Sequence, residues 1–261
     1  KDAHTVCVGN EEYSASKIII ATGSKPKMPP HADIDMNVVS TSTEMLQLNY
    51  VPESIAIVGA GVIGMEFASI FNSFGSKVTV IEFLKECLPA VDSDVAKRLR
   101  KQLEKRGISF SMQSAVKRIS TEGVVFERKG KEDTVSAEIV LVATGRMPNT
   151  EGLNLEAAGV EYSPKGITTD DRMHTNVEGI YAIGDVNGRQ MLAHAATMQG
   201  YMVVNEILGK QSGICLDIMP AAIFTRPEAA CVGVSEDFCK EKGMEYTYRK
   251  AFFRSNGKAL S

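Results

Sequence analysis

The sequence predicts an α/β protein built around a parallel sheet, and three observations support this prediction. A short apolar strand at Ile55–Val58 leads directly into a glycine-rich turn at Gly59–Gly64 and an apolar helix. A second apolar strand at Val78–Glu82 follows that helix, as in a strand–helix–strand unit. Further β-branched runs at 17–24 and 139–145 lack polar alternation, which is typical of strands buried on both faces of a sheet.

Size and composition limit the class of protein. The 261 residues allow one large domain or two smaller ones, and 44% hydrophobic with 23% charged residues is ordinary for a globular chain. A net charge of −3 argues against a nucleic-acid or anionic-membrane partner. No apolar run reaches the length of a membrane span. Because the chain starts without Met and lacks a closing signal, we expect a piece of a longer protein.

The five cysteines lie at positions 7, 87, 215, 231 and 239. Their number is odd, and no pair has the spacing of a zinc site or a redox dithiol. We therefore expect free thiols in a reducing cytoplasm, and neither a metal site nor a catalytic residue within this chain.

The first elements read as a hairpin and a buried strand. Thr5–Val8 and Glu11–Tyr13 flank a Gly-Asn dipeptide, which is typical of a tight β-turn. The apolar strand at 17–24 comes next, and residues 25–36, with three prolines, predict a surface connection.

Two helices are predicted in the central part of the chain. The helix after the glycine-rich turn runs to Phe74, and Gly75 is placed to end it. Asp92–Arg106 has apolar residues every four positions, begins with capping residues at 92–94 and ends at Gly107, which predicts an amphipathic helix.

The second half of the chain starts with strands. Residues 108–113 and 115–137 predict strands and hairpins, and the strand at 139–145 repeats the Ala-Thr-Gly ending of residues 21–23. This internal repeat indicates two related modules. A further buried strand spans Gly179–Asp185.

A helix and a smaller unit complete the chain. The helix is predicted from Met191 to about Leu208. Residues 216–261 predict the start of another α+β unit, with strands at 221–224 and 229–234 and an exposed apolar face.

The glycine triple at 59, 61 and 64 fits a dinucleotide site. Gly59 permits the tight turn, Gly61 lets a pyrophosphate approach the backbone, and Gly64 lets the helix pack closely on the strand. The start of the helix then offers unpaired N–H groups to phosphates. A bare glycine triple is a weak signal, but here a strand precedes it and a helix follows.

Glu82 indicates which dinucleotide binds. It ends the next strand 18 residues after Gly64, close to the spacing expected for an acid that accepts hydrogen bonds from a ribose 2′-hydroxyl. No arginine follows it to hold a 2′-phosphate, so NAD is favoured over NADP.

Two further features are candidates for ligand contacts. Asp185 ends a strand where sheet ligands usually bind, although a turn-capping role fits it equally well. His194 lies at the start of the next predicted helix, where a half-buried histidine with satisfied hydrogen bonds is the ordinary interpretation. If this helix start points at a flavin, its positive end would stabilise the negative charge of the reduced ring.

Taken together, these motifs resemble the flavin- and pyridine-nucleotide-dependent disulfide oxidoreductases. The resemblance implies a Rossmann-like FAD/NAD(P)-binding fold with a three-layer ββα NAD domain, FAD and NAD as cofactors, and a homodimer. The motifs that carry it, in chain order, are Ile20–Ser24, Gly59–Glu66, Ser76–Glu82, Ala143–Asn149, Thr175–Asp185, Met191–His194 and Phe224–Glu228.

The resemblance also implies roles for individual residues. It places Thr22, Gly23 and Ser24 beside FAD, Asp185 on the ribityl chain, and Met191, Leu192, Ala193 and His194 at the isoalloxazine edge. The NAD contacts that it implies are Gly59, Ala60, Gly61, Val62, Ile63, Gly64, Met65, Glu66 and Glu82, with Val116 and Gly145 closing over the cofactor.

The resemblance divides the chain into four segments. Residues 1–46 are the end of a first FAD segment, 47–167 the NAD domain, 168–215 a returning FAD segment and 216–261 a truncated interface domain. The family's FAD glycine motif, cysteine pair and catalytic histidine are not found here, so we expect the chain alone to bind NADH but neither to retain FAD nor to catalyse dithiol oxidation.

Several functions stay open at this point. The resemblance implies a dithiol substrate on a small molecule or a lipoyl domain. A single-cysteine peroxidase or coenzyme A disulfide reductase is an alternative within the family, and a non-catalytic NAD-binding module is an alternative outside it.

Overall fold

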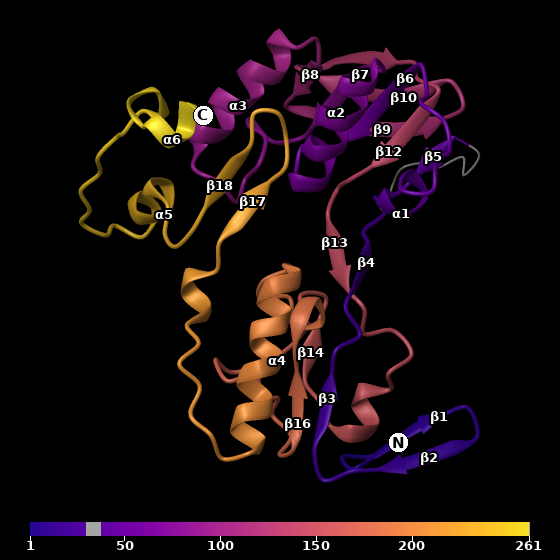
Figure 1. Ribbon diagram of the computed structural model, residues 1–261. Helices are drawn as coiled ribbons and strands as arrows, with labels where there is room; N and C mark the ends of the chain where they lie inside the picture. Colours follow the sequence, from indigo (N-terminus) through magenta and orange to yellow (C-terminus); the bar gives the residue numbers. More distant parts are fainter. Residues whose placement is uncertain (30–37, 261) are drawn as a thin grey trace.

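The computed structural model describes residues 1–29 and 38–260, which form two units joined by a two-stranded ribbon (Figure 1). The larger unit contains a five-stranded parallel sheet. Its strands, in spatial order, are β5 (Val39–Ser40), β12 (Ile139–Val142), β6 (Ser54–Val58), β7 (Lys77–Glu82) and β8 (Ser109–Met112). The predicted strand–helix–strand unit is β6–α2–β7, and it lies in the middle of this sheet.

Both faces of the large sheet are covered. Helices α2 (Val62–Phe74) and α3 (Ser93–Lys105) pack on one face, where Ile55 and Ile57 point. Ala56 and Val58 point to the other face, because neighbouring side chains of a strand alternate. That face is covered by the antiparallel strands β9 (Ser114–Ser120), β10 (Gly123–Arg128) and β11 (Lys131–Val135). The predicted three-layer ββα arrangement is confirmed.

The smaller unit begins with the predicted hairpin, β1 (Thr5–Val8) and β2 (Glu11–Ser14). Strand β3 (Ile18–Ile20) then pairs in parallel with β16 (Ile180–Ala182). Ile18 and Ile20 pack on a cluster that includes Leu155, but Ile19 is 38% exposed. The expectation that this strand is buried on both faces is therefore wrong, because the described residues cover only one of its faces.

The ribbon between the units consists of β4 (Ser24–Pro26) and β13 (Arg146–Pro148), paired antiparallel. The predicted surface connection at 25–36 is thus wrong for its first two residues, since Lys25 pairs with Met147. Residues 30–36 of that segment lie outside the described residues. Proline is tolerated here because each ribbon strand has a free edge.

The Ala-Thr-Gly repeat has a structural counterpart at the ribbon. The Thr22 hydroxyl donates to the carbonyl of Asn149 at 2.7 Å, and the Thr144 hydroxyl donates to the carbonyl of Lys27 at 2.8 Å. Thr22 and Thr144 occupy the same position in the two copies of the repeat. Each threonine donates to the residue that lies five positions after the other threonine. The two related segments therefore bind each other through matching contacts.

Helix α4 (Ala193–Ile207) packs beside β16 in the smaller unit (Figure 1). Ile180 of β16 packs in one hydrophobic cluster with residues from the segment before it, namely Leu153, Leu155, Ala158, Val160 and Ile167. The short elements of the chain are α1 (Ser42–Met45), η1 (Leu155–Ala158), β14 (Tyr162–Ser163), β15 (Gly166–Ile167), η2 (Gly184–Asn187), η3 (Leu216–Ile218), η4 (Phe253–Ser255) and α6 (Gly257–Leu260). In the described residues, no helix combines the length and apolar character that crossing a membrane requires.

The last part of the chain returns to the larger unit (Figure 1). Strands β17 (Ala221–Ile223) and β18 (Ala229–Cys231) form a hairpin, shorter at both strands than predicted. Ile223 is buried in the helix–sheet core, whereas Phe224 and Val234 are more than 60% exposed.

Helices α3 and α5 (Glu236–Glu241) cap each other. Asp92 occupies the N-cap position of α3, but its carboxylate accepts the backbone N–H groups of Glu236 and Asp237, both at 3.3 Å. Asp237 in turn accepts the N–H of Ser93 at 2.7 Å. Asp92 is thus the N-cap residue of α3, in agreement with the expected start of this helix, but its side chain caps α5, because the start of α5 lies within its reach.

Candidate functional site

The glycine-rich turn between β6 and α2 is packed against its neighbours at two of its three glycines. A Cβ on Gly59 would lie 2.4 Å from the carbonyl oxygen of Ala143, and the φ of Gly59 is +107°. A Cβ on Gly64 would lie 2.1 Å from the carbonyl oxygen of Gly59. Real Cβ atoms do not approach backbone oxygens so closely, so these two positions require glycine.

Gly61 is different, because the space beside it is open. No heavy atom lies within 4 Å of a Cβ built there, and its backbone is extended, with φ −72° and ψ −176°. Gly61 lines a cavity of about 420 Å³ at the carboxyl ends of the parallel strands. The predicted site residues that this cavity brings together are Gly59, Gly61, Glu82, Val116 and Gly145.

Glu82 is 9% exposed and holds the turn in place. Its Oε2 accepts the backbone N–H of Ala60 at 2.6 Å, and its Oε1 accepts the N–H of Leu84 at 2.8 Å. A carboxylate offers about four acceptor sites, so two remain for a ligand hydroxyl. Glu82 therefore ties the glycine-rich turn to the end of β7 and can still bind a ribose.

Other residues of the predicted motif do not face the cavity. The side chains of Ala60 and Met65 are fully buried in the core. Glu66 accepts the backbone N–H of Phe224 at 2.9 Å, and through this bond α2 contacts the segment after β17. The cavity is also lined by residues that sequence reasoning did not predict, among them Phe83, Pro89 and Ser114.

A second group of predicted residues lies at the ribbon and the smaller unit. The Ser24 hydroxyl donates to the Asp185 carboxylate at 2.5 Å, next to Thr22 and Gly23. The η2 turn that carries Asp185 is fixed by the buried side chain of Gln199, which accepts the N–H of Gly184 at 2.7 Å. The structure thus brings Asp185 next to Ser24, the residue that directly follows the first Ala-Thr-Gly segment.

The last predicted residues, Met191 to His194, lie around the start of helix α4, in which Leu192 is the N-cap and Ala193 is the first helical residue. Among the described residues, no side chain caps this helix N-terminus. His194 is exposed, and its Nε2 donates to the carbonyl of Pro220 at 2.7 Å, because a carbonyl can only accept. This bond ties the start of α4 to the segment before β17.

The two groups of site residues lie in different units but are joined through the chain. Thr144 and Gly145 line the cavity of the larger unit, and Arg146 directly after them contacts Ser24 in the ribbon. The ribbon therefore connects the surroundings of Glu82 to those of Asp185.

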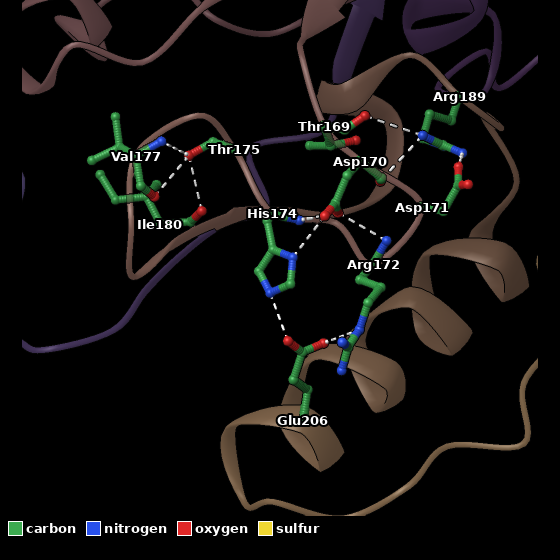
Figure 2. A network of polar contacts seen from close by, with 10 residues as sticks. All are labelled: Thr169, Asp170, Asp171, Arg172, His174, Thr175, Val177, Ile180, Arg189 and Glu206. Carbon is green, nitrogen blue, oxygen red and sulfur yellow. Dashed lines mark hydrogen bonds and ion pairs between the residues drawn. The ribbon is translucent and has the colours of Figure 1, made fainter.

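Sequence reasoning missed a charged cluster around His174 (Figure 2). The ring Nδ1 lies 2.8 Å from Asp170 Oδ2, and Nε2 lies 2.6 Å from Glu206 Oε1 on α4. Arg172 makes an ion pair with Glu206 at 3.0 Å, and the Tyr181 ring lies 5.1 Å from the His174 ring. Two carboxylates accept from both ring nitrogens, so the arrangement favours the charged imidazolium.

This cluster should make stability depend on pH. The hydrogen bond to Asp170 raises the pKa of His174 despite partial burial, with a further contribution from Glu206. A raised folded-state pKa means that the stabilisation is complete below about pH 6.5 and is lost as pH rises through the folded value. We expect His174→Gln to lower the melting temperature more at pH 6 than at pH 9, as measured by calorimetry.

The control is His4→Gln, which changes an exposed histidine of the N-terminal turn. It should have the same small effect at both pH values. An equal loss for His174→Gln at pH 6 and pH 9 would show that the charge of His174 contributes nothing to stability.

All five cysteines are free thiols. Cys87 and Cys239 are buried, and burial raises the pKa of the Cys87 thiol to about 12. Since the thiolate is the reactive form, Cys87 is chemically inert at neutral pH.

The larger unit contains a βαβ unit with a glycine-rich turn, an acid at the end of the second strand and a cavity between them. These features define the class of dinucleotide-binding α/β proteins. The comparisons specify the family. Residues 1–200 match the model of the pyridine nucleotide-disulphide oxidoreductases, and residues 219–261 match the dimerisation domain of the same family. The chain belongs to the pyridine nucleotide-disulphide oxidoreductase family.

Individual relatives agree with this assignment. The chain is 39% identical to a mitochondrial dihydrolipoyl dehydrogenase of Pisum sativum, over 96% of this chain and 51% of the relative. It is 38% identical to a dihydrolipoyl dehydrogenase of Bacillus subtilis, over 97% of this chain and 56% of the relative. The chain spans about half the length of these curated relatives.

Solved structures show the same architecture. An HOCl-induced flavoprotein disulfide reductase of Escherichia coli superimposes with a TM-score of 0.82 at 32% identity, covering 93% of this chain and 57% of that chain. The predicted Rossmann-like fold and the predicted family are confirmed.

Proposed function

We propose that this chain is the central part of an NAD-linked flavin disulfide oxidoreductase of the dihydrolipoamide dehydrogenase type. Such an enzyme oxidises dihydrolipoamide to lipoamide and reduces NAD to NADH, with the reactive cysteines and the base outside this chain. The observation that carries the proposal is the open space at Gly61 beside the Glu82 carboxylate, at the end of a parallel sheet. The similarity to dihydrolipoyl dehydrogenases supports the choice of substrate.

The residues of the larger unit fit NAD. The backbone of Gly61 and the N–H groups at the start of α2, which no side chain of the described residues caps, would bind the pyrophosphate. The space beside Gly61 is open, and the helix dipole is positive at this end. Glu82 would accept the ribose hydroxyls with its two remaining acceptor sites, and Val116 and Gly145 would form the cavity wall.

The residues of the smaller unit fit FAD, which when bound would take electrons from the dithiol and deliver them to NAD. Asp185 would accept ribityl hydroxyls, next to Thr22, Gly23 and Ser24. The uncapped start of α4, with Met191 to His194, would stabilise negative charge on the ring.

We expect Glu82→Ala to weaken NADH binding by about 1–3 kcal/mol. The ribose loses its hydrogen-bond acceptor, and the glycine-rich turn loses the hydrogen bond between the Ala60 N–H and Glu82. NADPH should be affected less, since its 2′-phosphate is repelled by a carboxylate. Isothermal titration with both nucleotides measures the difference, and Glu122→Ala, in an exposed loop, is the control. Equal losses for NADH and NADPH would mean that Glu82 is not the ribose partner.

Further parts of the proposal concern assembly and location. The match of residues 219–261 to a dimerisation domain, and the exposed apolar side chains Phe224 and Val234, support a homodimer. A lipoyl group, free or on a protein domain, would be the substrate. The free cysteines support a reducing compartment such as the cytoplasm.

The test of the proposed function uses the full-length protein that contains this chain. The purified protein should show the absorption bands of bound flavin, and it should reduce NAD when dihydrolipoamide is added. A colourless protein that still binds NADH would instead support a non-catalytic NAD-binding module. A flavoprotein that oxidises NADH with peroxide or coenzyme A disulfide, but not with lipoamide, would support the single-cysteine alternatives.

A further inference from the structure

The Asp185 carboxylate is held at one oxygen and free at the other. Oδ2 accepts the Ser24 hydroxyl at 2.5 Å and lies 4.0 Å from Nε of Arg146. In the part of the chain that the structure describes, no hydrogen bond reaches Oδ1. The side chain is 25% exposed, so a ligand can reach this carboxylate.

Arg146 fixes the serine that holds this carboxylate. Its Nε donates to Ser24 Oγ at 2.7 Å, and its Nη2 donates to the carbonyl oxygen of Ser24 at 2.7 Å. Because the hydroxyl accepts from the guanidinium, its single proton is directed to Asp185. The three side chains thus form one ordered chain of hydrogen bonds, in which Arg146 donates to Ser24 and Ser24 donates to Asp185. Hydrogen bonds in such a chain strengthen one another.

The backbone around Ser24, Arg146 and Asp185 is held in place by the surrounding structure. Ser24 and Arg146 are the first residues of β4 and β13, and each directly follows an Ala-Thr-Gly segment. Asp185 lies in η2, whose backbone is fixed by the buried Gln199. A change at Arg146 is therefore transmitted to Asp185 through Ser24 rather than through a shift of the turn.

We propose that Arg146 is a positioning residue that acts through Ser24 to hold Asp185 ready for the hydroxyl groups of the flavin ribityl chain. The proposal rests on the proposed function, because it concerns the flavin site. A carboxylate with one oxygen already fixed presents the other in a defined direction, which lowers the ordering cost when a ligand binds. Arg146 itself needs no contact with the flavin for this effect.

The experiment measures the dissociation constant of FAD from the full-length protein by flavin fluorescence. Arg146→Met and Ser24→Ala should each raise it about tenfold, as expected when a hydrogen bond to a charged group is lost. The double variant should match the single variants, because both break the same chain. Ser24→Thr keeps the hydroxyl and should restore the original affinity.

The controls distinguish a specific loss of FAD affinity from a general disturbance of the fold. Lys25→Ala changes the neighbouring residue of β4, which pairs with Glu151 and does not contact Asp185, and it should leave the FAD affinity unchanged. The affinity for NADH should stay within about twofold in all variants, because the hydrogen bonds that hold Glu82 at its cavity do not involve the substituted residues.

Two results would overturn the inference alone: an unchanged FAD affinity in Arg146→Met, or a loss of about a hundredfold in the double variant, which indicates independent contacts. Absence of flavin from the unsubstituted full-length protein would overturn the proposed function and this inference together.

Discussion

Replacing Gly64 with alanine is expected to lower the free energy of unfolding by about 3 kcal/mol, or the melting temperature by roughly 10 °C. The new Cβ would lie 2.1 Å from the carbonyl oxygen of Gly59 and 3.3 Å from the Ile57 side chain. Relief of this clash requires α2 to move away from β6, which opens the core between helix and sheet. The better helix propensity of alanine, about 1 kcal/mol, does not offset this cost.

The matched control is Gly200→Ala in the middle of α4. Its Cβ would meet its nearest atom, in Ile183, at an ordinary 3.5 Å, so this change should leave stability unchanged or raise it slightly. Both variants are compared by thermal and urea unfolding. If Gly64→Ala proves as stable as the unsubstituted chain, the close packing of α2 on the turn does not exist.

Replacing Gly61 with alanine, unlike the change at Gly64, should leave the stability of the protein normal. It should lower the affinity for NADH roughly a hundredfold, or by about 2.7 kcal/mol. The Cβ meets no protein atom within 4 Å, and the backbone conformation suits any residue. The methyl group would project into the space through which the pyrophosphate reaches the backbone. Isothermal titration with NADH and a melting curve on the same sample measure both quantities.

Gly213→Ala is the control for this variant, because it also adds a methyl group in open space but lies away from the cavity. Its NADH affinity should be normal. An NADH affinity that Gly61→Ala leaves intact would place the pyrophosphate elsewhere on the protein.

The central strands and helix of the larger unit are predicted well from the sequence, because the residue patterns that specify them are local. The strand–turn–helix–strand unit from β6 to β7 depends on an apolar run, three glycines and a spacing, all within 30 residues. The same local pattern identifies Gly59, Gly61 and Glu82, which the structure brings to one cavity. The hydrogen bonds from Ala60 and Leu84 to Glu82 were not predicted, because they depend on how the turn folds back over the strand end.

Contacts between distant parts of the chain were not predicted. Ser24 and Arg146 are 122 residues apart, and a segment with a proline at position 26 gives no sign that it will pair as a strand. Asp92 caps a helix about 144 residues away, although its neighbours make it look like the cap of its own helix. In each case the partner comes from a segment more than 100 residues away in the sequence, which local patterns do not reveal.

The most direct test of the central claim, that the cavity beside Gly61 and Glu82 is an NAD site, is a titration of this chain with NADH and NADPH. We predict one NADH bound per chain, with NADPH at least tenfold weaker, because the proposed role of the Glu82 carboxylate is to accept ribose hydroxyls, and a carboxylate repels a 2′-phosphate. Binding of NADPH as tightly as NADH, or no binding of either nucleotide, would contradict the account.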